Sequence, residues 1–325
     1  MKKILISAYC LMLAVSAQAV STGPTDDAMT VGGGARPIGM GRAFLAISDD
    51  CDAQFINPAG LASLKGPQAM SMFTNLIQDV YYMEYSGAVP TPYGTVGAGY
   101  ITTGVTGIPE SGGGTSDYYD SLLAFSYSTS IGRFAQYGKN VFVGLNFKIF
   151  NRGFTGVTNQ FGTGYGADLG LKMIVNPNLS FAFCRQNILP VSMGGGIKYG
   201  TGVEEYMAGL YKVGAAIRPA PLPKLTTAID LDLPAMTGRP PTGHLGFEWK
   251  ENKYLSVRAG MDQSVDAASE SLAAWNPTFG ASLTYGGFRV DYAYHPYYNY
   301  PELANTYVSF SYIGEPWFAM KGTVE

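Results

Sequence analysis

A few residues of this chain are of types that bind metals or phosphate. Their spacing does not complete a metal site or a phosphate site. Asp49, Asp50 and Asp52 form an acidic cluster, but their spacing and the missing downstream glutamate do not make an EF-hand loop for Ca²⁺. Glycine triplets at 112–114 and 194–196 would suit a phosphate cradle, yet neither is followed by the Lys-Ser/Thr pair and helix of such a loop. We therefore expect no metal and no cofactor.

Histidine-based catalysis is also poorly supplied, because the chain contains 2 histidines, His244 and His295. A hydrolase triad would need a serine beside one of them on the face that meets lipid, whereas both histidines fall on the polar face of their segments. We predict that the protein is not an enzyme. The net charge of −3 and the pI near 5.5 likewise give no basic field for nucleic acid.

Composition indicates a chain with few solvated faces. It holds 42 Gly and 23 Tyr but only 14% charged residues, whereas soluble chains average about 25% charged. No segment beyond the N-terminal leader offers about 18 consecutive apolar residues, so transmembrane helices do not explain this composition. A closed β-barrel is the other structure that satisfies every backbone N–H and C=O in lipid.

Residues 1–19 predict a cleaved secretory signal peptide. Lys2 and Lys3 form a basic start, residues 4–15 are apolar, and residues 17–19 (Ala-Gln-Ala) form a small-x-small cleavage site. The apolar stretch of about 12 residues is too short for a membrane anchor, which needs roughly 20. Cleavage leaves Cys51 and Cys184, which permit one disulfide but no disulfide framework or metal site.

From about Gln68 onward the sequence divides into segments of roughly ten residues that alternate in polarity. Leu169 and Leu171 share one face of such a segment, for example, and Asp168 and Lys172 share the other. The predicted fold is an all-β membrane protein with an antiparallel transmembrane β-barrel of about 14 strands, an even number as in bacterial single-chain barrels. We expect strands near 68–78, 80–90, 92–103, 119–130, 140–151, 163–174, 178–187, 207–218, 223–232, 242–250, 254–262, 277–285, 287–295 and 304–313.

A soluble β-sandwich would alternate too, but the number of amphipathic segments, the aromatic strand ends and the lack of a covering helix favour the barrel. Short turns alternate with long polar connections near 104–118, 152–162, 188–206, 233–241, 263–276 and 296–303, as in barrels with short periplasmic turns. Charged residues on the polar face are then expected in the lumen, paired across strands and with a plug. They are Lys148, Asp168, Lys172, Asp230, Asp232, Glu248, Arg258, Asp262, Arg289 and Asp291.

A glycine-rich segment, GGGARPIGMGRAFLAISDDCDAQFINPAGLASL, precedes the strands at 32–64. It resembles the GARxxGMGxAF…DDxxAxxxNPAGLA signature of the FadL (long-chain fatty-acid transporter) superfamily, particularly its PorV/PorQ-type branch. Later segments, such as GGFRVDYAY at 286–294, look like the same branch. The resemblance implies that residues 20–66 form a periplasmic plug or hatch in a barrel spanning 67–314, followed by a periplasmic extension at 315–325. Its motif residues are Gly39, Gly41, Asp49, Asp50, Asn57, Pro58, Ala59 and Gly60.

The same glycines have a physical role independent of the resemblance, because they let backbone approach the wall closely and adopt positive φ. We expect the protein in the bacterial outer membrane, in contact with outer-membrane lipid, and the resemblance leaves two functions open. The first is a plugged channel for hydrophobic or amphipathic small molecules, with such a ligand or detergent in the lumen. The alternative is a PorV-like component of type IX secretion, whose partners are secreted proteins or secretion machinery.

Overall fold

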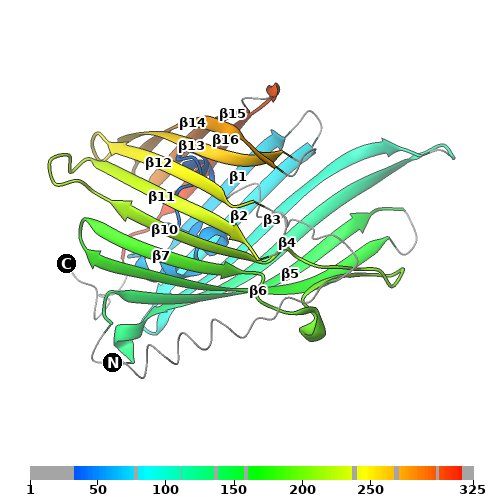
Figure 1. Cartoon of the computed structure of the whole chain (residues 1–325), viewed down its shortest axis with the longest axis horizontal. Coiled ribbons are helices and arrows are strands. Elements are labelled where there is room, and N and C mark those ends of the chain that lie inside the picture. Colours follow the sequence, from blue (N-terminus) through cyan, green and yellow to red (C-terminus); the bar gives the residue numbers. More distant parts are fainter. Residues whose placement is uncertain are drawn as a thin grey trace.

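The computed structural model describes residues 33–76, 80–110, 112–134, 138–156, 160–235, 240–266, 271–297 and 300–316. The predicted signal peptide, the connection at 77–79 and most of the predicted C-terminal extension lie outside these residues. Within them the chain forms a closed antiparallel β-barrel of 14 strands (Figure 1). The predicted fold class is therefore confirmed.

Each strand of the barrel pairs with its neighbours in chain order, and β1 closes the ring by pairing with both β2 and β16. The closing ladder runs from Gln68 opposite Ile313 to Phe73 opposite Val308. The barrel strands are β1 (Gln68–Leu76), β2 (Val80–Thr91), β3 (Gly94–Pro109), β4 (Thr115–Ser130), β5 (Val141–Phe154), β6 (Phe161–Asn176), β7 (Leu179–Gln186), β10 (Leu210–Ile217), β11 (Leu225–Pro234), β12 (Thr242–Lys250), β13 (Leu255–Asp266), β14 (Ser271–Tyr285), β15 (Phe288–Tyr297) and β16 (Tyr300–Ile313).

The remaining elements are short. Two strands, β8 (Gly196–Tyr199) and β9 (Glu204–Glu205), form a hairpin that pairs with β6. The helices are α2 (Ala35–Gly39), α3 (Ala53–Ile56), η2 (Pro58–Ser63), η3 (Ile131–Arg133) and η4 (Val191–Met193). In the part of the chain that the structure describes, none of these helices has the length and apolar character to cross a membrane.

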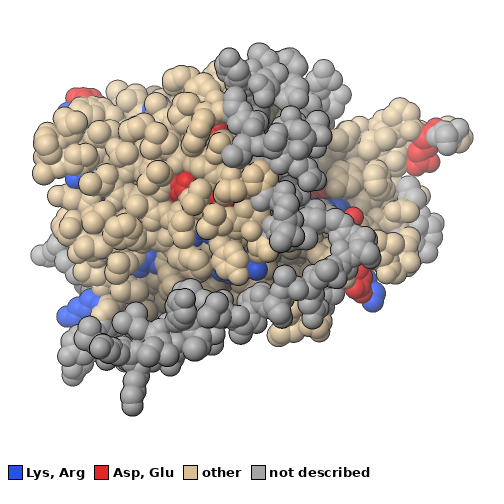
Figure 2. Space-filling model, viewed as in Figure 1, with Lys and Arg blue, Asp and Glu red and all other residues tan. Residues whose placement is uncertain are grey.

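Alternation sorts the side chains of each strand between the two faces of the wall. On β5, Leu145 and Phe147 are 52% and 45% exposed on the outer face, whereas Lys148 is fully buried on the inner face. Similarly exposed apolar residues recur on the other strands, and the face seen in Figure 2 is mostly free of charge between the two ends of the barrel. An apolar surface of this extent suits hydrocarbon better than water.

The long connections predicted at 104–118, 263–276 and 296–303 are wrong, because most of these residues continue the strands. β3 runs to Pro109 and β4 starts at Thr115, and β13 and β14 are separated only by residues 267–270. The prediction depended on alternating polarity, which fades where both faces of a hairpin meet water although the backbone ladder continues. The barrel therefore extends as paired ribbons at this end, visible for β3 and β4 at the right of Figure 1.

Candidate functional site

Residues 33–64, the inner segment, lie inside the barrel (Figure 1). Helix α2 packs against β14 and β15, while η2 packs against β4, β5 and β6. Nearly every residue of the segment is buried. The segment is too short to form a domain of its own, so the barrel wall buries it. Its wall contacts concentrate toward the short turns, near the start of β5 and the end of β6. The segment therefore occupies the half of the lumen that adjoins the short-turn end.

Glycines of the inner segment lie in close contact with the backbone of the barrel wall. A Cβ added to Gly39 would lie 3.0 Å from the Cα of Gly280 on β14. Gly41 has a φ of +60°, and its added Cβ would lie 2.5 Å from the backbone nitrogen of Met261 on β13. Side chains at these positions would push the two backbones apart, so the glycines set how closely the segment seats.

Asn57, Pro58, Ala59 and Gly60 form the turn that ties the segment together. The Asn57 carboxamide oxygen accepts a hydrogen bond from the Ala59 amide at 3.2 Å, which caps η2. The Asn57 Nδ2 donates to the carbonyl of Leu45 at 3.3 Å and to that of Leu171 on β6 at 3.1 Å. One side chain thus links two stretches of the inner segment to each other and to the wall.

The barrel wall leaves room for this turn through a glycine of its own, Gly144 on β5. A Cβ added there would lie 2.2 Å from the carbonyl carbon of Pro58. We expect Gly144→Ala to lower the free energy of unfolding by about 1–3 kcal/mol, because backbone must move to admit the methyl group. Urea unfolding in detergent measures this loss. Gly112→Ala is the control, since nothing lies within 4 Å of an added Cβ there, and an equal effect of both changes would contradict the packing argument.

Polar side chains of the wall bind the backbone of residues 44–48. The Asp230 carboxylate accepts hydrogen bonds from the amides of Phe44 and Leu45 at 2.7 and 2.8 Å. The Lys172 ammonium donates to the carbonyls of Ile47 and Ser48. These two residues, both predicted in the lumen, satisfy irregular backbone that would otherwise be buried without partners.

Arg36 of the inner segment is the centre of the largest ionic cluster. Its guanidinium contacts Asp49 at 2.5 Å, Asp50 at 2.9 Å and Glu248 of β12 at 2.9 Å. Burial by itself would raise the pKa of Asp49, but the positive charges of Arg36 and Lys250, together with the hydrogen bond from Arg36, hold this pKa well below its usual range. Arg36 thus joins Asp49 and Asp50, which were predicted as motif residues, to Glu248, which was predicted in the lumen.

The cluster continues around the wall through alternating charges. Arg258 of β13 contacts Glu248 at 2.7 Å and Asp291 of β15 at 3.2 Å. Arg289 contacts Asp291 at 2.6 Å and returns to Asp50 at 3.1 Å. Because each charge has at least one opposite neighbour, the cluster joins three strands to the inner segment, and most of its members are buried.

Three further polar groups involve predicted lumen residues. Asp262 contacts Nδ1 of His244 and Nε2 of His295, each at 2.8 Å, and Arg42 of the inner segment at 3.5 Å. Asp232 contacts Lys212 at 3.1 Å. On the other side of the lumen, Lys148 contacts Asp168 at 2.8 Å, and Asn146 and Asn187 also bind Asp168.

Asp52 lies between the inner segment and β2. Its carboxylate accepts a hydrogen bond from Ser86 at 3.0 Å, and Ser86 also contacts the Cys51 thiol. Glu84 approaches the same place, where it accepts the Gly34 amide at 2.9 Å. Cys51 and Cys184 are both buried free thiols. Among the described residues, no group of three or more histidine, cysteine or acidic side chains is placed to hold a metal ion.

Burial, together with the adjacent Asp50 carboxylate, raises the pKa of Asp52 from 3.8 to about 8. The folded protein therefore holds a proton on Asp52 at pH values where the unfolded chain has released it, so this contribution to stability is complete below pH about 4 and is lost as pH rises through 8. We expect Asp52→Asn to flatten the decline in stability between pH 5 and 9 and to stabilise the protein at pH 9. Urea unfolding at pH 5, 7 and 9 measures this, and an unchanged slope in the variant would contradict it.

The lumen also has an apolar side that alternation does not reveal. Fully buried inward residues on neighbouring strands are Tyr82 on β2, Ile101 on β3, Leu122 on β4, Phe150 on β5 and Tyr307 on β16. They pack with Phe55 of the inner segment and Ile197 of β8 in one cluster. Together they form an apolar arc on the inner face of the wall, packed against the inner segment and bordered by the buried charges of Glu84 and Lys148. The inner face around His244 and Asp262 is polar.

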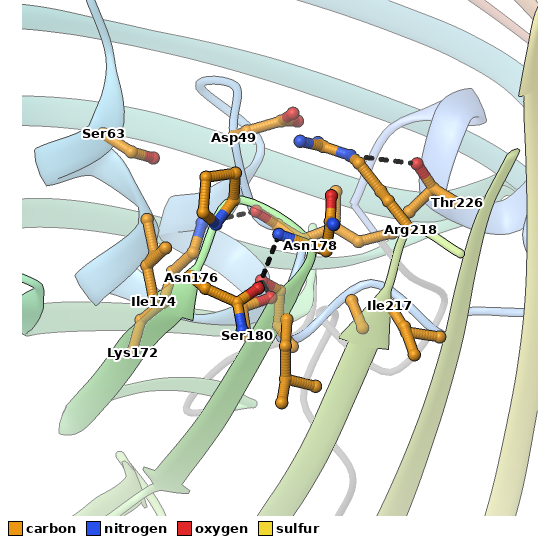
Figure 3. A pocket seen from close by; sticks show the side chains of 15 residues that line it. Asp49, Ser63, Lys172, Ile174, Asn176, Asn178, Ser180, Ile217, Arg218 and Thr226 are labelled. Atoms are coloured by element: carbon orange, nitrogen blue, oxygen red, sulfur yellow. Dashed lines mark hydrogen bonds between the residues drawn. The ribbon is translucent and has the colours of Figure 1, made fainter. Parts of the chain in front are cut away.

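A cavity of about 140 Å³ opens between the inner segment and the wall at the short-turn end (Figure 3). Ala46 and Ile47 line it on one side, and the ends of β6, β7 and β10 line it on the other. The Arg218 guanidinium points toward Asp49 across this space in Figure 3, while its Nε donates to Thr226 at 3.3 Å. The inner segment thus leaves part of this mouth unfilled.

Sequence reasoning did not select Arg36, Arg42, Lys212 and Glu84 as site residues. Arg36 and Arg42 lie within the motif and are the cations of an otherwise apolar and acidic stretch, which is a usable signal. Lys212 and Glu84 lie on the same alternating face as the predicted lumen charges. No sequence signal marks Ile101 or Leu122. An apolar residue on the inner face breaks the alternation of polarity, and an irregular strand would break it in the same way.

No protein-family model and no curated protein sequence matches this chain. Several solved structures, however, have a similar fold. The Pseudomonas putida toluene transporter TodX superimposes with a TM-score of 0.62 at 14% identity, covering 87% of this chain and 99% of TodX. The monoaromatic hydrocarbon channel CymD gives 0.60 at 13% identity, covering 88% and 98%. A Pseudomonas aeruginosa FadL homologue gives 0.56 at 10% identity, covering 91% and 100%. At such identities the likeness concerns the fold, and the chain has the FadL-type barrel fold that its sequence resemblance predicts.

Proposed function

We propose that this protein is an outer-membrane channel for hydrophobic or amphipathic small molecules, with the inner segment as its plug. The observation that carries the proposal is the apolar arc of Ile101, Leu122 and Phe150 on the inner face of the wall, which packs against the inner segment. A water-filled porin has a polar lumen, whereas a pathway for apolar molecules needs apolar walls that replace water around them. The fold shared with TodX, described as a toluene transporter, and with CymD supports the same class.

The direction of passage follows from the proposed placement in the outer membrane. Short turns would face the periplasm and the extended hairpins the exterior, as in other outer-membrane barrels. A molecule entering between the hairpins would meet the apolar arc first and the inner segment second. The cavity beside Ala46 and Ile47 then supplies the start of an outlet, which a small displacement of the inner segment would join to the lumen.

Uptake by cells tests this function. A Gram-negative host lacking a hydrocarbon channel is given the gene, and accumulation of labelled toluene is measured against an empty host. We expect faster uptake with the wild type and slower uptake with Ile101→Asn, because an amide in the apolar arc disfavours an apolar molecule there. Thr103→Asn, at the next inward position of β3, is the matched control and should leave uptake unchanged. Equal uptake by wild-type and empty hosts would remove the proposal.

The second candidate is a PorV-like role in type IX secretion, and the GARPIGMG…NPAGLA stretch favours it. In this role the outer hairpins and the segment 187–209 would receive secreted proteins, and the lumen would stay closed. Co-isolation from native membranes distinguishes the two candidates. Recovery of secreted proteins or other secretion components, together with absent toluene uptake, would support the secretion role. Gene neighbourhood gives an independent indication, since secretion components should then occur in the same genome.

A further inference from the structure

The two ends of the barrel differ in charge, although the chain as a whole has a net charge of −3. At the short-turn end, cations outnumber carboxylates among the described residues. The cations that reach this surface are Lys65, Arg133, Lys139, Arg218, Lys224, Lys250 and Lys253, and the exposed carboxylates are Glu251 and Glu315. The hairpins at the opposite end instead carry Glu110, Asp117, Glu204 and Glu205 around Lys198. Figure 2 shows mainly blue atoms along the lower left and both red and blue atoms at the right end.

Part of this basic end carries aromatic side chains between its lysines. We call Lys224, Trp249, Lys250, Lys253 and Tyr254 the basic rim. The Lys224 ammonium lies 5.9 Å from the centroid of the Trp249 ring, and the Lys253 ammonium lies 5.0 Å from that of Tyr254. The exposed ring of Tyr285 lies 6.3 Å from Tyr254 and extends the aromatic surface. Aromatic rings at strand ends occupy the headgroup level of a bilayer, so these lysines are held at the same level.

The carboxylates near the basic rim do not cancel its charge. Glu251 contacts Lys224 at 3.0 Å, but both side chains are about half exposed, so water and salt weaken this pair. Glu248 contacts Lys250 at 3.3 Å but is already engaged by Arg36 and Arg258. No carboxylate within the described part of the chain lies in ion-pair contact with Lys253. The ammonium group of Lys253 is therefore available to an anion from outside the protein, and the half-exposed Lys224 and Lys250 add positive charge beside it.

We propose that the basic rim binds the phosphate groups of anionic phospholipids in the membrane leaflet that surrounds the short-turn end. Lysines above aromatic rings hold their ammonium groups where lipid phosphates lie, and an excess positive charge favours lipids whose headgroup has no compensating cation. A soluble acidic protein would not need rings that face outward along the wall. The inference rests on the barrel fold and is independent of what the lumen carries.

Tryptophan fluorescence tests the proposal, because Trp249 lies in the basic rim. The chain has 3 tryptophans. Changing Trp275 and Trp317 to phenylalanine leaves Trp249 as the reporter, and changing Trp249 and Trp317 leaves Trp275, an exposed residue of β14 near the opposite end. Each protein is reconstituted into phosphatidylcholine vesicles that contain a small fraction of brominated phosphatidylglycerol or brominated phosphatidylcholine, both of which quench an adjacent tryptophan.

We expect brominated phosphatidylglycerol to associate at Trp249 at least about fivefold more strongly than brominated phosphatidylcholine, the preference that one contacting lysine supplies. High salt should reduce this preference. The triple change of Lys224, Lys250 and Lys253 to glutamine should abolish it, whereas Lys198→Gln at the opposite end should not. Heat-modifiable migration on gels verifies that every variant is folded. Equal quenching by both lipids at Trp249, the same preference at Trp275, or a preference that survives the triple change would each overturn the proposal.

Discussion

Deleting the inner segment, residues 33–64, is expected to raise the single-channel conductance of the reconstituted protein several-fold. Barrels of about eight strands are filled by their own side chains, whereas wider barrels leave an aqueous passage unless something occupies it. In this 14-stranded barrel the occupant is the inner segment, since nearly all of its residues are buried against the wall. Planar-bilayer recording of wild-type and deleted proteins measures the difference.

The deletion also removes partners of buried wall charges, so its folding must be checked separately. Heat-modifiable migration and a β-rich circular dichroism spectrum would show that the barrel has formed. A conductance change in such folded protein reports on the lumen. If folded, deleted protein conducts no better than wild type, the inner segment is not the barrier and the plug assignment fails.

Changing Arg36 to methionine is expected to destabilise the folded protein by about 3–5 kcal/mol, the cost of leaving a buried charge without its partner. The change leaves Asp49, Asp50 and Glu248 with fewer positive neighbours, and the carboxylates of Asp50 and Glu248 are buried. Urea unfolding in detergent measures the loss. Because Arg36 joins the inner segment to the wall, we also expect faster proteolysis of residues 33–64 in the variant.

A matched control separates burial from the mere presence of an ion pair. Lys198 contacts Glu204 at 3.2 Å, but the two side chains are 70% and 41% exposed. Lys198→Met should therefore cost at most about 1 kcal/mol. A double change of Arg36 and Glu248 to neutral residues should be less harmful than the sum of the single changes, because the partners share the interaction. Additive effects would contradict the role given to this contact.

The sequence by itself determined the class of fold and which face of each strand meets the lumen. A strand repeats every two residues, so polarity in the chain directly records two environments, and the alternation of Leu169 and Leu171 with Asp168 and Lys172 predicted the orientation that the structure has. The same signal placed most strand starts within a few residues. It failed near Pro109, because both faces of the strand there meet water and polarity no longer alternates.

Only the tertiary structure decided which charges meet and which inward residues are apolar. Arg36 and Glu248 are 212 residues apart in the chain, and their contact depends on where the inner segment seats against β12. That position depends in turn on close backbone contacts such as Gly39 with Gly280, which no local pattern specifies. Likewise Ile101 and Leu122 become one apolar surface only when β3 and β4 pair in register around a closed ring, because neighbours across strands are set by pairing and not by sequence distance.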